Sequence, residues 1–248
     1  MTLNSFFSEN PRLALAFSGG VDSAYLLYAA TAALADVTAY YVHSAFQPEF
    51  ELRDAQRLAA ELGAKMRVLE LDVLCDETIT ANPADRCYHC KKRIFTAIVQ
   101  AAQEDGYELL IDGTNASDDA ADRPGIRALR ELEVRSPLRE CGITKAQVRQ
   151  LSREANLFTW DKPAYACLAT RIPTGEPITA EKLQKTEQAE EFLKSLGFVD
   201  FRVRLMGKSA KLQVRGEQLG LLVEKRSEIL AGLKPLYSNI LLDLEVRA

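Results

Sequence analysis

The sequence lacks any stretch approaching the roughly 20 uninterrupted apolar residues that a membrane-spanning helix needs, and its start has no basic leader followed by a long apolar segment. We therefore expect a cytoplasmic protein with no membrane partner. A basic excess is also missing, because 31 Lys and Arg against 35 Asp and Glu give a formal net charge of −4. This balance argues against a chain coated for nucleic acid, so any basic site must be local and no nucleic-acid partner is expected.

The composition excludes wholesale disorder and fibrous repetition. Of the 248 residues, 47% are hydrophobic and 27% are charged, which is typical of a globular protein with a packed core. The length favours a large and a small domain. Five cysteines, an odd number, fit poorly with a disulfide framework, so metal-binding, catalytic or buried thiols are expected.

The first half predicts an α/β domain over residues 1–157. Short apolar runs typical of strands fall at residues 13–17, 37–43, 66–71 and 109–112. Apolar residues recur at helical spacing from Ala55 to Leu62, Gly63 stops that helix, and another helix starts after the cap residue Thr144. Strands alternating with helices predict a parallel sheet with helices on both faces.

The second half predicts a different organisation. Residues 158–177 contain three prolines and a glycine and carry Cys167, so we expect an irregular connector that belongs to the active site. Residues 178–248 alternate as helix, two strands, helix and strand, with strands at 198–205, 211–215 and 240–246 and a helix at 217–230. This order predicts a small α+β domain.

The turn from Ser18 to Ser23, SGGVDS, joins the first predicted strand to a helix. Gly19 and Gly20 let the backbone approach a ligand closely, and the following helix offers unpaired N–H groups, so the turn predicts a phosphate site. Ser18 and Ser23 add hydroxyl donors, and Asp22 is placed to hold Mg²⁺ that bridges phosphates. Neither Walker A nor G-x-G-x-x-G is present, which removes the support for ordinary P-loop hydrolysis and dinucleotide binding. SGGVDS instead resembles the PP-loop of the ATP pyrophosphatases, which implies ATP binding and formation of an adenylate.

Three of the cysteines suggest a metal or sulfur site. Cys87 and Cys90 form C-x-x-C at the start of a helical stretch, a spacing that suits a shared metal or cluster or a redox pair. Cys167 has Arg171 nearby, a cation that favours a thiolate. Three cysteines without a fourth match an iron–sulfur cluster with one open iron; zinc with His89 as fourth ligand ranks lower because His89 lies between two ligands. Cys75 and Cys141 have no partnering pattern and are interpreted as small buried or incidental thiols.

These motifs together resemble the LarE family of ATP-dependent pyridinium biscarboxylate mononucleotide sulfurtransferases, which help to build the nickel-pincer nucleotide cofactor. The matching segments are SGGVDS at 18–23, DRCYHCKK at 85–92, DGTNASDD at 112–119, DRPGIRAL at 122–129, WDKPAYACLATRIPTG at 160–175 and GFVDFRVR at 197–204. The resemblance implies a PP-loop domain followed by a smaller α+β domain, and a homohexamer.

The resemblance also implies the chemistry. ATP with Mg²⁺ adenylylates a carboxylate of the pyridinium mononucleotide, pyrophosphate leaves, and a sulfur nucleophile displaces AMP to give a thiocarboxylate. Members with one cysteine at the position of Cys167 sacrifice its sulfur and end as dehydroalanine. Members that also have the C-x-x-C pair hold a [4Fe-4S] cluster and pass on a sulfide. Cys87, Cys90 and Cys167 point to the cluster version, which needs sulfide or another sulfur donor, and the sacrificial route stays as the alternative.

Several side chains are candidates for substrate contact. Arg202 and Arg204, two apart in a predicted strand, share one face and suit a phosphate, although a solvated basic stripe would have the same spacing; the resemblance favours the mononucleotide. Lys91 and Arg171 are candidates for pyrophosphate or substrate. Glu190 matches a family glutamate implicated in sulfur transfer, where it accepts a proton or orients the thiol.

Residues at the ends of predicted strands are candidates for the nucleotide. Asp112 and Gly113 end one strand, and His43 and Ser44 end another, at the edge where open α/β sheets bind ligands. Three acidic residues in the following segment are interpreted as solvated charges, with magnesium binding as the alternative; they are Asp118, Asp119 and Asp122.

Three other functions compete with this interpretation. A PP-loop tRNA thiolase also combines a PP-loop with cysteines, but it predicts a basic groove or an RNA-binding appendage, and the sequence indicates neither. An amidating synthetase would have no use for three matched cysteines. A nucleotide-sensing module would bind ATP without turnover.

Overall fold

The computed structural model describes residues 1–118 and 124–247 and divides the chain into two compact units. The first unit comprises Met1–Asp72 and Asp85–Lys162, and the second comprises Val73–Ala84 and Pro163–Ala248. The sequence predicts a first domain over residues 1–157, whereas in the structure the segment 73–84 belongs to the second unit.

Hydrogen bonds explain why this short segment groups with the second unit. Asn82 is 1% exposed, and its amide Nδ2 donates to the carbonyl oxygens of Pro173 at 2.7 Å and Glu176 at 3.1 Å. The backbone N–H of Gly175 donates to the Asn82 carbonyl at 2.8 Å. These bonds join residues about 90 positions apart in the sequence, and no local pattern encodes them.

The first unit is built on a four-stranded sheet in the order β3-β2-β1-β4, and all its strands are parallel. Its strands are β1 (Arg12–Ala16), β2 (Asp36–His43), β3 (Lys65–Glu70) and β4 (Leu110–Asp112). The central strand β1 is buried from Leu13 to Ala16, as a strand covered on both faces must be. The four strands lie within one residue of the predicted ranges at each end, which confirms the predicted parallel α/β sheet.

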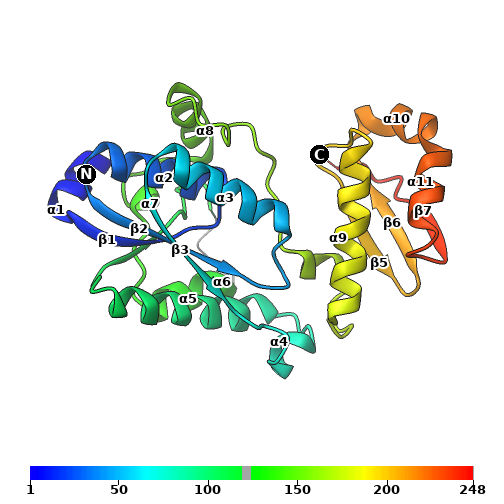
Figure 1. Cartoon of the computed structure of the whole chain (residues 1–248), viewed down its shortest axis with the longest axis horizontal. Helices are drawn as coiled ribbons and strands as arrows, with labels where there is room; N and C mark the ends of the chain where they lie inside the picture. The colour runs from blue at the N-terminus through cyan, green and yellow to red at the C-terminus, as the bar shows by residue number, and fades with distance from the viewer. Residues whose placement is uncertain (119–123, 248) are drawn as a thin grey trace. The chain divides into compact units, whose positions relative to one another are not determined.

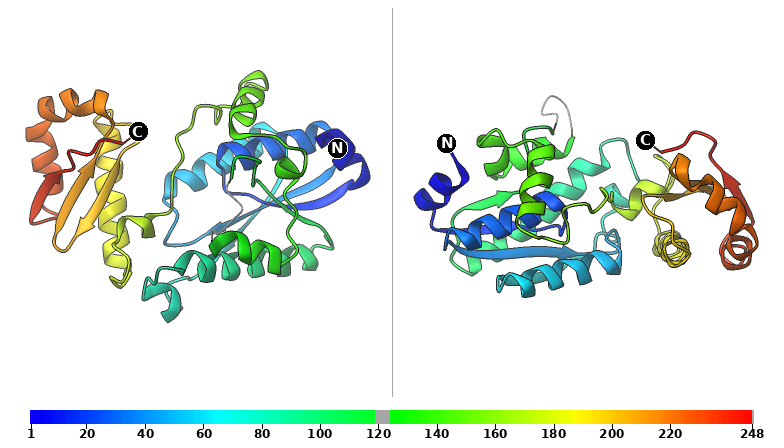
Figure 2. Two further views of the ribbon diagram at one scale, coloured as in Figure 1. Left: turned by 180° about the vertical axis from the view of Figure 1, so that it is seen from behind. Right: turned by 90° about the horizontal axis from the view of Figure 1, so that it is seen from above.

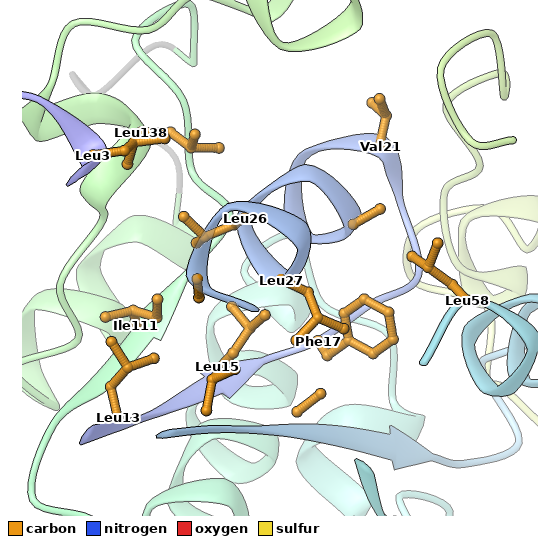
Figure 3. Close-up of a cluster of buried hydrophobic side chains, with 14 of the residues drawn as sticks. Leu3, Leu13, Leu15, Phe17, Val21, Leu26, Leu27, Leu58, Ile111 and Leu138 are labelled. Atoms are coloured by element: carbon orange, nitrogen blue, oxygen red, sulfur yellow. The ribbon is translucent and has the colours of Figure 1, made fainter. Parts of the chain in front are cut away.

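Helices cover both faces of this sheet (Figure 1). They are α1 (Leu3–Glu9), α2 (Val21–Ala32), α3 (Glu49–Glu61), α5 (Arg86–Glu104), α6 (Pro124–Glu131), α7 (Pro137–Glu140) and α8 (Lys145–Glu154). On one face, α2 packs Leu26 and Leu27 against Leu13, Leu15 and Phe17 (Figure 3). On the other face, α5 and α6 pack against alternate residues of β1 and β2. Thr144 caps α8 with a capping box, as predicted.

The parallel strands bring the candidate site residues to one edge of the sheet. Because the strands are parallel, their carboxyl ends lie at the same edge of the sheet, and the turns after β1, β2 and β4 start there. Helix α5 leads into β4, so its first residue also lies at this edge. The PP-loop turn, His43, Asp112 and the start of α5 with its C-x-x-C pair are therefore neighbours by topology.

The second unit has a three-stranded sheet in the order β5-β6-β7, with β5 and β6 antiparallel and β6 and β7 parallel. Its elements are α4 (Glu77–Thr80), η1 (Leu168–Arg171), α9 (Ala180–Ser195), β5 (Arg202–Met206), β6 (Ser209–Gln213), η2 (Gly216–Gln218), α10 (Leu219–Glu224), α11 (Arg226–Leu233) and β7 (Asn239–Leu242). Helices α9 and α11 lie side by side on one face of the sheet (Figure 2). The predicted order of helix, two strands, helix and strand is confirmed.

Several element boundaries in this unit differ from the predictions. The strand predicted at 211–215 runs over Ser209–Gln213, and the strand predicted at 240–246 runs over Asn239–Leu242. The strand expected at 198–205 starts only at Arg202, because Asp200 adopts a positive φ of 45° that interrupts the extended chain. The helix expected at 217–230 is a 3₁₀ turn followed by two helices, which meet at Lys225. Residues 158–177 are irregular apart from the 3₁₀ turn η1. In the described part of the chain, no helix combines the length and apolar character needed to cross a bilayer.

Candidate functional site

The PP-loop turn joins β1 to α2, and no side chain of the described residues caps the N-terminus of this helix. Gly19 has a φ of +69°, a conformation that glycine adopts without strain. The hydroxyl groups of Ser18 and Ser23 lie 3.1 Å apart, and Ser23 Oγ donates to the Gly20 carbonyl at 3.2 Å. These bonds hold the turn open around the first N–H groups of α2, which have no partner within the helix. The turn therefore has the geometry of an anion site.

Gly113 brings the end of β4 against this turn. A Cβ atom at Gly113 would lie 2.8 Å from the backbone nitrogen of Ser23 and 3.2 Å from the carbonyl carbon of Asp22. Real Cβ contacts are not this short, so only glycine allows the two segments to approach so closely. The structure thus places Gly113 in the wall of the predicted phosphate site.

Asp22 is held by two residues that the sequence did not single out as site residues: Asn115, within the DGTNASDD segment, and Lys145, which lies in no motif. Lys145 Nζ lies 2.5 Å from Asp22 Oδ2, and Asn115 Nδ2 donates to Asp22 Oδ1 at 3.2 Å. Lys145 is the first residue of α8, and its backbone N–H donates to Ser117 Oγ at 3.0 Å. The ammonium group of Lys145 and the carboxylate of Asp22 are thus adjacent, beside the predicted phosphate site.

Asp112 stabilises the same region through hydrogen bonds to two side chains. It is 6% exposed, its Oδ1 accepts from Ser136 Oγ at 2.6 Å, and its Oδ2 accepts from the Thr114 hydroxyl. Both carboxylate oxygens therefore bind side chains of the first unit, and the residue braces the loop that carries Gly113. Asp118 closes the same loop by accepting from the Asn115 N–H at 3.0 Å. Asp119 and Asp122 lie outside the described residues.

His43 and Ser44 follow β2 at the same edge. The His43 ring bridges two carboxylates, with Nε2 3.0 Å from Glu49 and Nδ1 3.0 Å from Glu70. Ser44 is 6% exposed; its hydroxyl donates to Gln47 at 2.6 Å and accepts from the Phe46 N–H. These contacts fix the start of α3 beside the end of β3, at the edge where the sequence predicts the nucleotide.

Cys87 and Cys90 lie near the start of α5, three residues apart, so their side chains lie on the same side of the helix. Cys87 is exposed and Cys90 is half-buried. His89 lies between them and pairs with Asp85 at 3.2 Å. Lys91 is half-buried and has no hydrogen bond or ion pair with any residue that the structure describes.

The segment that carries Cys167 lies in the second unit and is held by Arg171. Arg171 is 2% exposed, and its Nη1 donates to the carbonyl oxygens of Ala166 at 2.8 Å and Cys167 at 3.3 Å. Glu190 accepts from Arg171 Nε at 2.8 Å and Nη2 at 3.1 Å. Burial alone would lower the pKa of Arg171, but the hydrogen bonds and the charge of Glu190 outweigh it and raise this pKa.

Glu190 is fully engaged in this network. Its Oε2 also accepts from the Tyr165 hydroxyl at 2.6 Å, and its Oε1 accepts from the Val203 N–H at 2.9 Å. Four donors on one carboxylate fix the Arg171 side chain and tie the Cys167 segment to β5. This arrangement suits a residue that orients the thiol more than one that exchanges a proton.

Arg202 and Arg204 approach the Cys167 segment from β5. Arg202 is 6% exposed and its Nη2 donates to the Ala164 carbonyl at 2.6 Å, while Arg204 Nη1 donates to the Thr170 carbonyl at 3.0 Å. Burial, followed by repulsion from Arg171 and Arg247, lowers the pKa of both guanidinium groups. Within 1–118 and 124–247, Arg204 has no carboxylate within ion-pair distance. Positive charge thus exceeds negative charge in this part of the described structure, which favours an anionic ligand.

The structure gathers the predicted residues into two groups. Cys167, Arg171, Glu190, Arg202 and Arg204 come together in the second unit, and the nucleotide candidates come together in the first. Sequence reasoning missed three contributors: Asn115, Lys145 and Tyr165. Tyr165 stacks within 4.5 Å of the Arg171 guanidinium, and only its position beside Cys167 could have indicated this role.

No disulfide joins any of the five cysteines, all of which lie in the described part of the chain. Across residues 1–118 and 124–247, no three Cys, His, Asp or Glu side chains are grouped so that they could hold a metal ion. The pair in α5 and the thiol of Cys167 belong to different units.

Comparison with known proteins agrees with these features. No protein-family model matches the chain. An uncharacterized protein of Synechocystis sp. is 40% identical over 224 residues, which cover 90% of this chain and 83% of that protein. The pyridinium-3,5-bisthiocarboxylic acid mononucleotide synthase of Lactiplantibacillus plantarum is 34% identical over 221 residues, which cover 88% of this chain and 80% of that protein.

A more distant match supports the assignment of the fold. The argininosuccinate synthase of Natronomonas pharaonis is 28% identical over 162 residues, or 60% of this chain and 40% of that protein. With the all-parallel sheet and its covering helices, this match confirms the predicted PP-loop fold. The chain belongs to the LarE family, the pyridinium-3,5-bisthiocarboxylic acid mononucleotide synthases.

Proposed function

We propose that this protein uses ATP and Mg²⁺ to convert a carboxylate of a pyridinium mononucleotide into a thiocarboxylate. A carboxylate oxygen attacks the α-phosphorus of ATP and pyrophosphate leaves; a sulfur nucleophile then attacks the acyl carbon and AMP leaves. The observation that carries the proposal is the grouping of the Cys167 segment with Arg171, Arg202 and Arg204 in a chain that also has a PP-loop turn.

The first unit supports the adenylylation step. The N–H groups at the start of α2, together with Ser18 and Ser23, would bind the β- and γ-phosphates. Asp22 would exchange Lys145 for Mg²⁺, and the released ammonium would then face the phosphates. Because the anion site and its counter-ions are already assembled, the negative charge that develops on the leaving pyrophosphate would be stabilised without rearrangement of the sheet.

The second unit supports binding of the mononucleotide and the sulfur step. Among the described residues, Arg202 and Arg204 each use two N–H donors in hydrogen bonds to the protein, so further donors remain for a phosphate or carboxylate. Arg171 and Glu190 would keep the backbone of the Cys167 segment in place. In this proposal Cys167 is the residue closest to the chemistry and Glu190 is a positioning residue.

The sulfur source follows from the cysteine set. Cys87 and Cys90, on one face of α5 near its start, fit two ligand positions of an iron–sulfur cluster, and Cys167 is the candidate for the third. A [4Fe-4S] cluster on these three thiols would supply a sulfide at the iron that lacks a protein ligand. We also propose the homohexamer and the cytoplasmic location that the LarE resemblance and the sequence imply.

The test is to incubate anaerobically purified protein with MgATP and pyridinium-3,5-biscarboxylic acid mononucleotide. We expect equal amounts of AMP and pyrophosphate, and a product in which oxygen is replaced by sulfur. Iron and acid-labile sulfide should be present in the protein. Colourless protein in which Cys167 becomes dehydroalanine after one turnover would contradict the cluster and support the sacrificial route. Nucleotide binding without pyrophosphate release would contradict the enzyme itself.

A further inference from the structure

We propose that Gly125 is a positioning residue that sets the path of the Lys91 side chain, and so determines where the Lys91 ammonium meets its anion. This inference rests on the proposed function, in which Lys91 is a candidate for binding pyrophosphate or substrate. Gly125 is the second residue of α6, which packs alongside α5, the helix that carries Lys91.

The contact between the two residues is unusually close. A Cβ atom at Gly125 would lie 2.7 Å from Cδ, 3.0 Å from Cε and 3.2 Å from Nζ of Lys91. The lysine side chain therefore crosses α6 through the space that the Cβ of any other residue would fill. Its ammonium lies against the helix backbone at this point.

The backbone conformation at position 125 does not require a glycine. Gly125 has no positive φ, so its conformation is open to other residues. Glycine is less favourable than alanine in a helix, by about 1 kcal/mol in the interior and by less in the first turn, where Gly125 lies. The glycine therefore lowers the stability of α6, and the space that it leaves is occupied by the Lys91 side chain.

Lys91 gains no charge partner among the described residues from this placement. It is half-buried and has no ion pair or hydrogen bond in the described part of the chain, although ordering a lysine side chain is entropically unfavourable. Lys91 also lies four residues after Cys87, on the same face of α5. An ordered ammonium beside the C-x-x-C pair, with its donors unused by the described residues, suits a side chain that binds an anionic ligand.

The clash from a new methyl group would fall on a flexible side chain and not on backbone, so the fold should tolerate it. Gly125→Ala should therefore leave the midpoint of thermal unfolding unchanged or raised, while it displaces the Lys91 ammonium. Gly220→Ala is the matched control, because Gly220 is also helical and a Cβ atom there would meet no described atom within 4 Å. An unchanged or raised unfolding midpoint together with a lower activity would show that Gly125 positions Lys91 and does not merely stabilise the fold.

The experiment measures pyrophosphate release from MgATP with pyridinium-3,5-biscarboxylic acid mononucleotide for Gly125→Ala, Lys91→Ala, the double variant and Gly220→Ala. We expect Gly125→Ala to lower kcat/KM by about tenfold or more, and to have less than about a twofold further effect when Lys91 is already alanine. Gly220→Ala should match the wild type. Unchanged kcat/KM in Gly125→Ala, or a full effect that persists in the Lys91→Ala background, would overturn the inference.

A second measurement does not depend on turnover. The Lys91 amine should acylate faster with acetic anhydride in Gly125→Ala than in the wild type, as measured by mass spectrometry of the peptide. An unchanged acylation rate would overturn the inference. If the wild type releases no pyrophosphate, the proposed function fails, and the acylation rate still decides whether Gly125 positions Lys91.

Discussion

Replacing Glu190 with glutamine should strongly destabilise the second unit, although the substitution only exchanges one carboxylate oxygen for an NH₂ group. Glu190 is 5% exposed and its carboxylate accepts four hydrogen bonds, two of them from Arg171. Glutamine keeps the shape but removes the charge, and its NH₂ group would face donors. Arg171, 2% exposed, would then be a buried cation that has lost its counter-ion.

The expected loss is about 3–5 kcal/mol in the free energy of unfolding of the second unit, the usual effect of removing one partner of a buried ion pair. Trp160 is the only tryptophan and lies in the first unit, so its fluorescence reports on that unit. Amide hydrogen exchange of β5 and α9 peptides as a function of urea reports on the second. Faster exchange there, with an unchanged Trp160 transition, is the predicted result.

Two further variants make this test specific. Glu191→Gln changes the neighbouring exposed glutamate of α9 and should shift stability by less than about 0.5 kcal/mol. Arg171→Met combined with Glu190→Gln removes both charges and should regain part of the loss, since the uncompensated cation is gone. If the β5 and α9 amides exchanged no faster in Glu190→Gln than in Glu191→Gln, the buried Arg171–Glu190 pair would not be what holds the Cys167 segment. That result would refute the reasoning.

Three other predictions concern the two groups of site residues. Lys145→Ala should raise KM for MgATP by about tenfold in pyrophosphate release, because the phosphates lose a cation; an unchanged KM would remove Lys145 from the site. Gly113→Ala should lower stability by about 1–3 kcal/mol, measured by Trp160 fluorescence in urea, since its methyl group meets the backbone of Ser23. Unchanged unfolding would show that the loop can move away. Arg204→Met should raise KM for the mononucleotide and leave KM for MgATP unchanged; equal effects on both would contradict its assignment to the mononucleotide.

The parallel sheet could be predicted from the sequence because each strand is a short apolar run with its own turn signals. The turn between the first strand and α2 could be predicted for the same reason, because SGGVDS is a continuous motif between a strand and a helix. Local patterns also indicated the Thr144 cap. In these cases, the information lies within a few residues.

The remaining features depend on contacts between distant residues. Lys145 and Asp22 are 123 positions apart, and nothing near either residue indicates that they form an ion pair. Asn82 joins the 73–84 segment to residues near 175 through side-chain bonds that no periodicity encodes. The late start of β5 reflects the positive φ of Asp200, which the apolar pattern does not show. Glu190 was identified as a candidate, but its four donors become visible only when the fold is known.

In the proposed reaction, one chain first activates a carboxylate at the PP-loop turn and then transfers sulfur at Cys167. The most direct test measures pyrophosphate and thiocarboxylate separately for Cys167→Ala, with MgATP and the pyridinium mononucleotide under anaerobic conditions. We predict that pyrophosphate is still released and that no thiocarboxylate forms. A thiocarboxylate product from the Cys167→Ala variant would contradict the account.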